Sequence, residues 1–196
     1  MSELTKMGDQ VAATVTRGAG QEEQVGLHGV YKAECFDAQG NLKWSDTFDN
    51  LTTNVGRQDM LNKYFAGSSY TQTIVVGLMG NYSGSSTPAY TDTQASHAGW
   101  LEVGGTNAPT YSGTRKTPTF SAATSANPSV LTTSAVVVFS MTGSGTVTGA
   151  FINNGGSSTI DNTTGTLFSA GNFTAGSKTV TSGDTINVTY TLSAAG

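Results

Sequence analysis

Residues 28–51 read HGVYKAECFDAQGNLKWSDTFDNL, and this stretch decides the fold. Apolar and polar side chains alternate on both sides of a short break at residues 37–41, DAQGN. Alternation with a period of two indicates a strand with one buried face, and a glycine-containing break indicates a tight connection. Gly40 can adopt the positive φ that such a connection needs. The stretch therefore predicts a β-hairpin in which Tyr31 and Cys35 share one face.

The composition supports a β structure whose surface is built on hydroxyl groups rather than on charge. The 196 residues include 32 threonines, 21 serines and 25 glycines, whereas charged residues make up only 11%. Threonine fits the pleat of a strand, and glycine and serine favour turns. Seven tyrosines, eight phenylalanines and two tryptophans argue against a low-complexity disordered chain. We therefore expect one all-β domain, a sandwich or jelly roll.

The chain divides into a polar start and a longer β-rich remainder. Residues 1–26 contain few large apolar side chains, among them Val11, Val15 and Val25, and these cannot close a hydrophobic core. A chain terminus of this composition is usually poorly ordered. We interpret it instead as an extended N-terminal arm held by a partner chain, which at about 3.3 Å per residue reaches on the order of 80 Å. Residues 27–196 then form the β domain.

One short helix interrupts the strands. Residues 52–67 read TTNVGRQDMLNKYFAG, and the period of their apolar side chains changes to that of a helix. The resulting stripe consists of Val55, Met60, Leu61, Tyr64 and Phe65. Asn54 is a suitable N-cap and Gly67 a suitable C-terminal stop. We predict a helix near residues 55–66 whose apolar stripe is buried against the core.

Most of the remaining chain reads as strands of ordinary length, about eight to ten in all, as in a sandwich or jelly roll. The apolar run at residues 71–80 indicates a buried strand. In residues 134–143, SAVVVFSMTG, both faces are apolar, which predicts a central strand. Glycines at residues 143–145 predict a hairpin to the strand that follows. Further strands are expected in residues 116–122, 145–154, 165–173 and 178–194, with a turn at 182–184.

The charge pattern argues against a nucleic-acid partner, and the apolar pattern argues against a membrane. The net charge is −4, the pI is near 4.9, and Lys178 is the only basic residue after Lys116. A phosphate backbone prefers a basic face. The first ten residues, MSELTKMGDQ, lack the apolar core of a signal peptide. The longest branched apolar stretch, residues 135–139, is far too short to span a bilayer. We expect no nucleic acid, no membrane and no export through a secretion pathway.

Residues suited to nucleophilic catalysis or to zinc binding are scarce. The chain has two histidines, His28 and His97, and one cysteine, Cys35, and it contains no G-x-S-x-G motif. Cys35 lies inside a predicted strand and is interpreted as a small buried residue, and a single cysteine excludes an internal disulfide. His97 is interpreted as a hydrogen-bonding loop residue rather than a general base. Zinc needs three or four ligands, which these residues do not supply.

The carboxylates form no recognisable site either. Asp37, Asp46 and Asp49 lie close together in sequence, but they lack the dense alternating oxygen ligands of a calcium loop. We interpret them as residues of a turn and of a solvated strand face. After residue 100, the acidic residues are Glu102, Asp161 and Asp184. Because this is a thin supply for paired acid–base chemistry, we expect no catalytic residue, no metal site and no cofactor.

Several short motifs together resemble a known protein family. They are C-F-D-A-x-G-N-L at residues 35–42, N-x-G-x-x-x-(M/I)-L-N-K-Y-F at residues 54–65, VGL at 76–78, ASHAGW at 95–100 and SGDTINVTYTL at 182–192. The chain is similar in these to small virion structural proteins of tailed bacteriophages. The resemblance covers most of residues 28–192 and includes no catalytic signature; residues 1–26 fall outside it.

The resemblance implies a capsid decoration (cement) protein that binds the outer capsid and stabilises it. Its partners would be the major capsid protein or other virion subunits, and we expect a homo-oligomer. The chain would be made in the cytoplasm of the host bacterium and would act in the virion, on the capsid surface rather than the tail. It would not be an enzyme. Many weak contacts repeated in a symmetric assembly add through avidity, so such a protein needs no reactive residue.

The main alternative is a tail or fibre component that acts in tail assembly or host-surface attachment. Residues 81–100, NYSGSSTPAYTDTQASHAGW, read as a long exposed loop, and loops of this length are often functional. Its aromatic residues Tyr82, Tyr90 and Trp100 would then bind a receptor or glycan, whereas interface packing or a place in the core explains them equally well. A glycan hydrolase is disfavoured, because the catalytic constellation is missing. The number of copies per virion distinguishes the two: hundreds indicate a decoration protein, and a dozen or fewer indicate a tail component.

Overall fold

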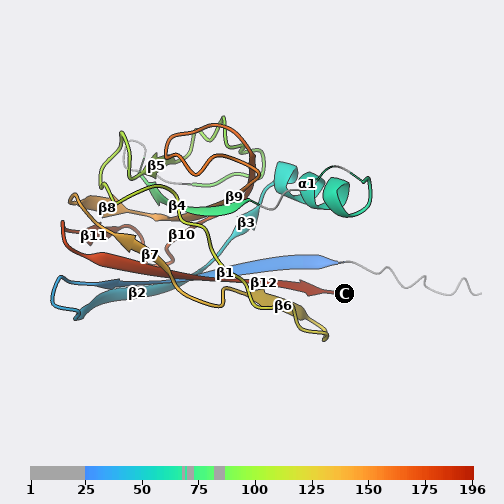
Figure 1. The fold of residues 1–196 in the computed structure, drawn as a ribbon, viewed down its shortest axis with the longest axis horizontal. Helices are drawn as coiled ribbons and strands as arrows, with labels where there is room; N and C mark the ends of the chain where they lie inside the picture. The colour runs from blue at the N-terminus through green and yellow to red at the C-terminus, as the bar shows by residue number, and fades with distance from the viewer. Residues whose placement is uncertain (1–24, 68, 70–72, 82–86) are drawn as a thin grey trace, which may run out of the picture.

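The computed structural model describes residues 25–67, 69, 73–81 and 87–196. Over these ranges the chain forms a sandwich of two antiparallel sheets with one helix, α1, at one end (Figure 1). The predicted all-β class with one short helix is confirmed. Residues 1–24 of the expected arm lie outside the described ranges, and the first strand already begins at Gly26.

The first sheet is built around the two longest strands. β1 (Gly26–Phe36) pairs along its whole length with β12 (Thr185–Ala195), so that residues near the two ends of the domain lie side by side. β2 (Leu42–Asp49) pairs with the other edge of β1. β6 (Ser129–Thr132) and β7 (Val137–Ser140) both pair with β12, one after the other.

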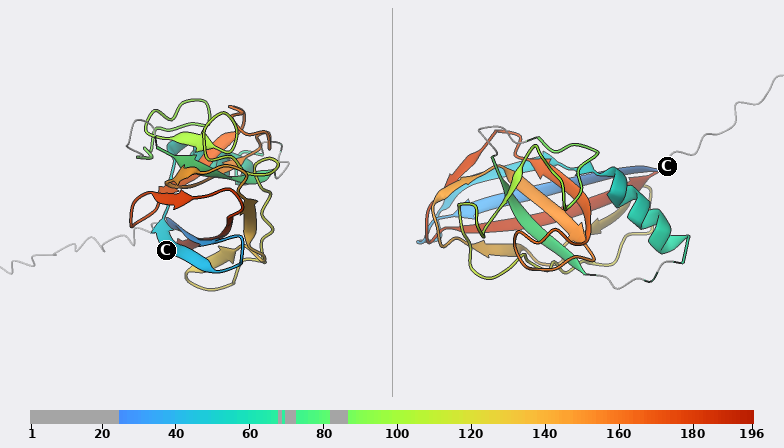
Figure 2. Two further views of the ribbon diagram at one scale, coloured as in Figure 1. Left: turned by 90° about the vertical axis from the view of Figure 1, so that its left-hand side faces the viewer. Right: turned by 90° about the horizontal axis from the view of Figure 1, so that it is seen from above.

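The second sheet packs on the first, and Figure 2 shows the two layers from one end. Its strand order is β3-β10-β9-β4-β5. The bounds are β3 Leu51–Thr52, β4 Ile74–Gly80, β5 Leu101–Val103, β9 Gly149–Asn154 and β10 Thr166–Asn172. A separate pair, β8 (Gly145–Val147) with β11 (Lys178–Val180), lies at the end of the sandwich opposite α1 (Figure 1).

The hairpin expected from residues 28–51 is present as β1 and β2. Its connection is fixed by the Asp37 carboxylate, which accepts hydrogen bonds from the backbone N–H groups of Gln39 and Asn41. These and the Asn41 side-chain amide lower the pKa of Asp37, because they favour the charged form. Gly40 has φ 84°, as the turn requires. The turn chemistry inferred for Asp37 is therefore confirmed.

The core between the sheets is rich in aromatic rings. Tyr31 of β1 stacks on Phe48 of β2 with ring centroids 5.1 Å apart, and Phe48 meets the edge of Phe173 at 5.0 Å. The hydroxyl of Tyr31 is 3.1 Å from that of Ser169 in β10, so one hydrogen bond joins the two sheets across the core. Both groups are fully buried, and the bond removes the cost of burying two unpaired hydroxyls.

Three expectations about the strands are wrong. β7 is not central, because β12 is the one strand with which it pairs among the described residues. At its other edge the backbone N–H of Ser112 donates to the Ser140 carbonyl, and Val138 on its outer face is exposed. The glycines at residues 143–145 do not close a β7–β8 hairpin, because β8 pairs with β11. Residues 116–122 form no strand and make only isolated bridges at Lys116 and Phe120. Strand partners depend on tertiary packing, which local periodicity does not encode.

The turn before β12 carries a buried carboxylate. Asp184 is almost fully buried, and it accepts hydrogen bonds from the Lys43 ammonium of β2 and from the backbone N–H of Thr181. Burial alone raises the pKa of Asp184, but the Lys43 and Thr181 hydrogen bonds outweigh it, so the net shift of the pKa is downward. The group therefore ties β2 to the last turn of the chain as a charged pair.

This pair predicts a pH-dependent contribution to stability. A carboxyl whose folded-state pKa is depressed stabilises the fold above its unfolded pKa of about 3.9, and this contribution is lost as the pH falls through the folded-state pKa. Asp184→Asn is expected to lower the free energy of unfolding by about 1–3 kcal/mol at pH 7. In urea titrations, the difference in the free energy of unfolding between Asp184→Asn and the unmodified chain is expected to become smaller below about pH 4. An equal difference in the free energy of unfolding at pH 7 and pH 3 would contradict this prediction. The control is Asp49→Asn, which changes an exposed carboxylate.

Candidate functional site

Helix α1 (Asn54–Tyr64) is held most closely at its N-terminus. It follows β3 directly, and its N-cap is Thr53 rather than the expected Asn54. The Thr53 hydroxyl accepts a hydrogen bond from the backbone N–H of Gly56, and it also donates to the carbonyl of Leu167 in β10. The helix ends at Tyr64 with Phe65 as C-cap, before the expected stop at Gly67.

The first turn of α1 presses against β10 at a glycine. Gly56 is the one buried residue of the helix, and a Cβ placed there would lie 2.5 Å from the carbonyl oxygen of Phe168. No real Cβ is found that close to a backbone oxygen, so only glycine permits this approach. Beyond Gly56 the helix leaves the sheet and projects from the end of the sandwich (Figure 1).

Gly56→Ala therefore tests the position of the helix. Alanine favours a helix over glycine by up to about 1 kcal/mol, but the clash is with backbone and no rotamer relieves it. We expect the free energy of unfolding to fall by about 1–3 kcal/mol, as measured by urea denaturation. Asn62→Ala, at an exposed position of the same helix, is the control and should not destabilise. A Gly56→Ala chain at least as stable as the original would show that the helix does not touch β10 there.

The apolar stripe of α1 is not buried, contrary to the expectation from the sequence. The exposed fractions are 36% for Met60, 52% for Leu61, 81% for Tyr64 and 76% for Phe65. The rings of Tyr64 and Phe65 contact each other edge to face at 4.8 Å. Met60 and Tyr64 line an apolar groove beneath the helix, which is described next, whereas Leu61 and Phe65 do not line it. The helix is present as predicted, but its apolar residues do not form one face that the core covers.

An apolar groove runs beneath α1 at the open end of the sandwich. Its volume is about 330 Å³. One wall is α1, and the others are side chains from strands of both sheets and from a loop. The apolar lining consists of Met60 and Tyr64 from α1, Ile74, Ile152 and Phe168 from the second sheet, Leu131, Tyr190 and Leu192 from the first, and Phe120 from a loop. Such a surface suits apolar side chains.

A small polar group lies along one edge of the groove. Asp59 of α1 accepts a hydrogen bond of 2.9 Å from the side-chain amide of Asn154 in β9. Lys63 lies one turn further on, with its ammonium 4.0 Å from the Asp59 carboxylate and 3.0 Å from the carbonyl oxygen of Ser69. The amide oxygen of Asn154 is buried and has no donor among the described residues. Asn154 therefore lies at the edge of the groove with its amide oxygen enclosed by the protein.

The loop before β5 is folded into the domain rather than held out as a tip. Trp100 is 1% exposed, its indole N–H donates to Asp92 at 3.0 Å, and its ring packs on Phe151 of β9. The expectation that Trp100 is a surface-binding aromatic is therefore wrong. Tyr90 is 56% exposed, and Tyr82 lies outside the described residues.

The two residues considered for catalysis are accounted for by structural contacts. His97 stacks on Trp100 with centroids 3.8 Å apart, and its Nδ1 is 3.0 Å from the Trp100 carbonyl oxygen, as expected of a hydrogen-bonding loop residue. Cys35 is fully buried in β1. Burial and the nearby Asp184 carboxylate raise the pKa of the Cys35 thiol to about 11, so the thiolate nucleophile is disfavoured.

The remaining residues of interest are dispersed. His28 pairs with Asp49 at 3.2 Å on an exposed surface of the first sheet. Asp46 is not on a solvated face as expected, because it is buried, accepts hydrogen bonds from the backbone N–H groups of Thr174 and Ala175, and lies 3.4 Å from the Lys178 ammonium. Across the part of the chain that is described, no three His, Cys, Asp or Glu side chains are grouped so as to hold a metal ion. None of its helices has the length and hydropathy of a membrane span.

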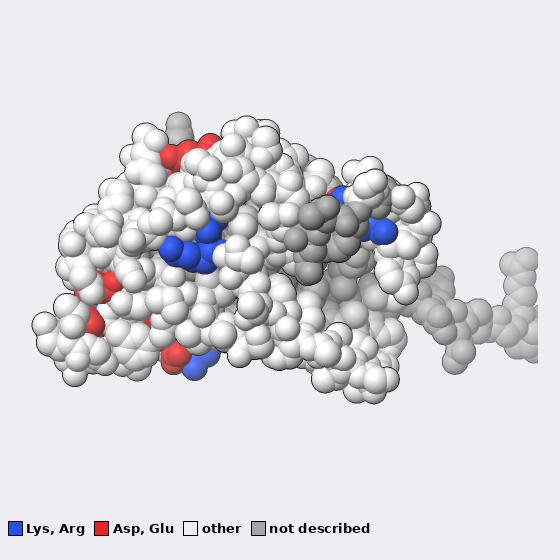
Figure 3. All heavy atoms as spheres, viewed as in Figure 1, with Lys and Arg blue, Asp and Glu red and all other residues white. Residues whose placement is uncertain are grey.

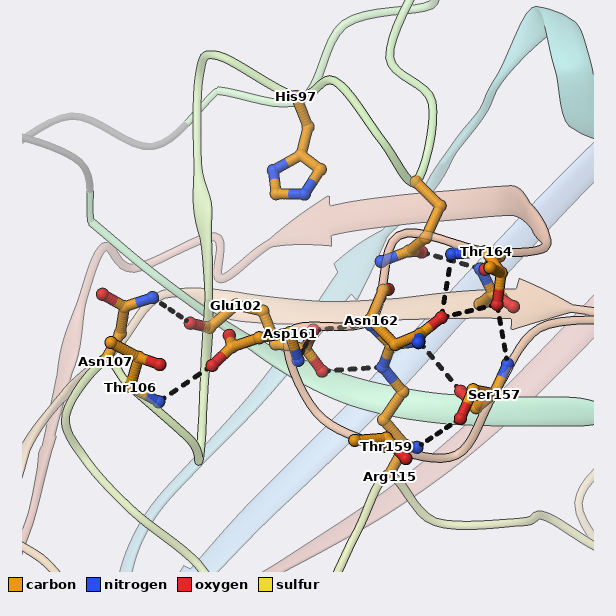
Figure 4. A network of polar contacts seen from close by, with 12 residues as sticks. His97, Glu102, Thr106, Asn107, Arg115, Ser157, Thr159, Asp161, Asn162 and Thr164 are labelled. Atoms are coloured by element: carbon orange, nitrogen blue, oxygen red, sulfur yellow. Dashed lines mark hydrogen bonds and ion pairs between the residues drawn. The ribbon is translucent and has the colours of Figure 1, made fainter.

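A buried ion pair was not foreseen from the sequence. Arg115 and Glu102 are 2% and 4% exposed, and they make a two-pronged contact with nitrogen–oxygen distances of 2.8 and 2.6 Å (Figure 4). The guanidinium also donates to the carbonyls of Ser157 and Asn162, and Glu102 accepts from the backbone N–H of Asp161. Together these bonds fasten the loop after β9 to β5.

The Arg115–Glu102 pair is structural because its hydrogen-bonding capacity is used within the chain. Four N–H···O bonds leave the guanidinium, which has five donors, and each ends on this protein. The fifth donor belongs to a side chain that is only 2% exposed, so a ligand has little access to it. The groove beneath α1 is therefore the better candidate for a functional site. The sequence signal for this groove is the apolar residues of the predicted helix. These residues alone do not distinguish an exposed surface from packing in the core.

Comparisons with protein-family models, with curated proteins and with solved structures each gave no match. The resemblance to phage virion proteins therefore stays a prediction from the sequence.

Proposed function

We propose that this chain is a structural protein of a tailed-bacteriophage virion, most specifically a capsid decoration protein that binds the outer capsid and stabilises it. Its partners are the major capsid protein or neighbouring virion subunits, and it acts as a homo-oligomer. It needs no cofactor and carries out no reaction. The family resemblance supports the phage context, and the exposed apolar surface of α1 supports docking onto another protein.

The observation that carries this proposal is the outward side of α1. Leu61 and Phe65 lie one helical turn apart, do not line the groove, and are more than half exposed. A soluble chain rarely leaves large apolar side chains grouped in this way unless another surface covers them. Aromatic and aliphatic anchors at the centre of an interface supply most of its binding energy. We assign this surface, Leu61 with Phe65, to the contact with the capsid.

The charge distribution fits a position away from packaged DNA. On the face drawn in Figure 3, acidic and basic side chains form small separate groups within a largely uncharged surface. Several basic residues are paired with carboxylates, among them Lys32 with Glu34, Lys43 with Asp184 and Lys178 with Asp46. Pairing reduces the positive potential that a phosphate backbone would need. A role on the outer surface is consistent with this pattern.

The tail or fibre alternative is less well supported. It depended on exposed aromatic side chains in residues 81–100, and Trp100 is instead part of the core. Tyr90 is exposed, but its ring already lies against the Arg57 guanidinium at 5.4 Å. No feature of the described residues favours glycan binding over protein docking.

The experiment is a binding assay on virions that lack the chain. Leu61→Asp with Phe65→Asp is expected to abolish binding of the purified protein to such particles, while its melting temperature stays within a few degrees, because exposed positions contribute little to the fold. Val136→Asp with Val138→Asp is the matched control, since it places the same two charges on exposed apolar residues elsewhere. Undiminished binding by the double variant would remove this helix surface from the proposal.

A further inference from the structure

We propose that the groove beneath α1 is the binding site for residues 4–15 of the same chain. The groove is a surface separate from Leu61 and Phe65, which do not line it. This inference goes beyond the proposed function, because it concerns the isolated protein and holds whether or not the chain belongs to a virion.

The place where the N-terminal segment joins the domain supports this assignment. Gly26, the first residue of β1, is paired with Ala195 of β12. Leu192 of β12 lines the groove, only three positions along the same strand. At about 3.3 Å per residue, the groove begins roughly 10 Å from the point where the segment leaves the domain. Both features lie at the α1 end of the sandwich (Figure 1).

The sequence of the segment matches the groove in chemistry. Leu4, Met7, Val11 and Val15 are spaced three or four residues apart, which is the anchor pattern of a peptide that places one apolar face in a groove. Residues 16–25 connect this stretch to β1; they read TRGAGQEEQV, and their one large apolar side chain, Val25, is exposed. They are a polar connection that spans up to about 30 Å, more than the distance required.

Tethering favours the chain's own segment over any free partner. A peptide joined by a short flexible connection has an effective concentration in the millimolar range at its site. A second copy at micromolar concentration competes poorly with it unless the geometry prevents self-docking. The separation of roughly 10 Å and the length of residues 16–25 do not prevent it.

The charged edge of the groove favours a polypeptide over a purely apolar ligand. Asp59 and Lys63 lie on this edge, with carboxylate and ammonium 4.0 Å apart. Residues 4–15 carry one charge of each sign, on Lys6 and Asp9. A peptide with both charges can pair with both groups, which a hydrocarbon cannot do.

Hydrogen exchange of the full-length chain tests the docking itself. Val11→Asp is expected to speed the exchange of backbone amides in the second half of α1 roughly tenfold, because a buried charge expels the segment from the groove. Gln10→Asp adds the same charge one position away, on the polar side of the stripe, and should leave the exchange rates unchanged. Equal rates in the original chain and the Val11→Asp variant would overturn the proposal.

A disulfide identifies which copy supplies the segment. Met7→Cys with Met60→Cys is expected to form an intrachain bond under mild oxidation, seen as a monomer of raised mobility on a non-reducing gel. Native Cys35 is fully buried and does not compete. Gln10→Cys with Met60→Cys is the control and should react more slowly. Disulfide-linked dimers would overturn self-docking and assign the groove to a neighbouring copy. Protection of α1 only after addition of virions would assign it to the capsid instead.

Discussion

Replacing Arg115 with alanine is expected to lower the free energy of unfolding by about 3–5 kcal/mol, one of the two largest effects anticipated for a single substitution. The reason is that Glu102 stays buried after its partner is removed, and a buried carboxylate without a counter-charge is strongly unfavourable. The carbonyls of Ser157 and Asn162 lose their donors at the same time. Urea denaturation monitored by circular dichroism measures the change.

Two further variants separate the ion pair from a general loss of packing. Lys116→Ala removes a neighbouring cation that is less buried and should cost less than about 1 kcal/mol. Arg115→Met combined with Glu102→Leu removes both charges while keeping apolar volume, and it should recover part of the stability lost in Arg115→Ala. An Arg115→Ala chain that unfolds at the same urea concentration as the original would contradict the buried pair.

Replacing Trp100 with alanine is expected to cost about 3–5 kcal/mol of the free energy of unfolding. The substitution leaves a cavity against Phe151, removes the ring on which His97 stacks, and takes away one of the two hydrogen bonds accepted by Asp92. A fall in melting temperature measures the effect. Trp100→Phe keeps most of the ring and should recover a large part of the loss.

The matched control for Trp100 is the exposed aromatic residue of the same loop. Tyr90→Ala removes a half-exposed ring and its contact with Arg57, which is worth about 0.5–1 kcal/mol. If Trp100 were instead a receptor-binding residue at the surface, its replacement would change stability as little as that of Tyr90. Equal and small effects for the two residues would therefore restore the tail-tip interpretation.

The parts of the fold that the sequence predicted correctly are those set by local periodicity. The β1–β2 hairpin follows from strict alternation and from the turn chemistry of Asp37 and Gly40, which act within a few residues. The buried side of β12 follows in the same way, since Ile186, Val188 and Tyr190 alternate with polar residues. Such signals require no knowledge of which elements become neighbours.

The parts that it did not predict depend on neighbours in space. Val138 reads as a core residue, yet it lies on the outer face of β7, which nothing in the described chain covers, while Val137 and Phe139 on the other face are buried. The α1 stripe has a helical period, but the helix is set by the approach of Gly56 to Phe168 so that most of the stripe faces solvent. Which strand or helix covers a surface is decided by tertiary packing rather than by local sequence.

The candidate site was only partly foreseeable for the same reason. The sequence located the helix and its apolar residues, but the groove forms from the ends of strands separated by more than a hundred residues, such as Ile74 and Leu192. Glu102 was noted as one of few carboxylates, whereas nothing in the local sequence marked Arg115 as its partner. Contacts of this range need the folded topology.

The proposal that the chain is a capsid decoration protein is tested most directly by its copy number in purified virions. Quantitative mass spectrometry, with the major capsid protein as internal reference, measures the molar ratio of the two. The account predicts a ratio that scales with the capsid lattice, with the chain present at a fixed stoichiometry per capsid subunit or per lattice position. Absence from purified particles, or the few copies typical of a tail component, would contradict it.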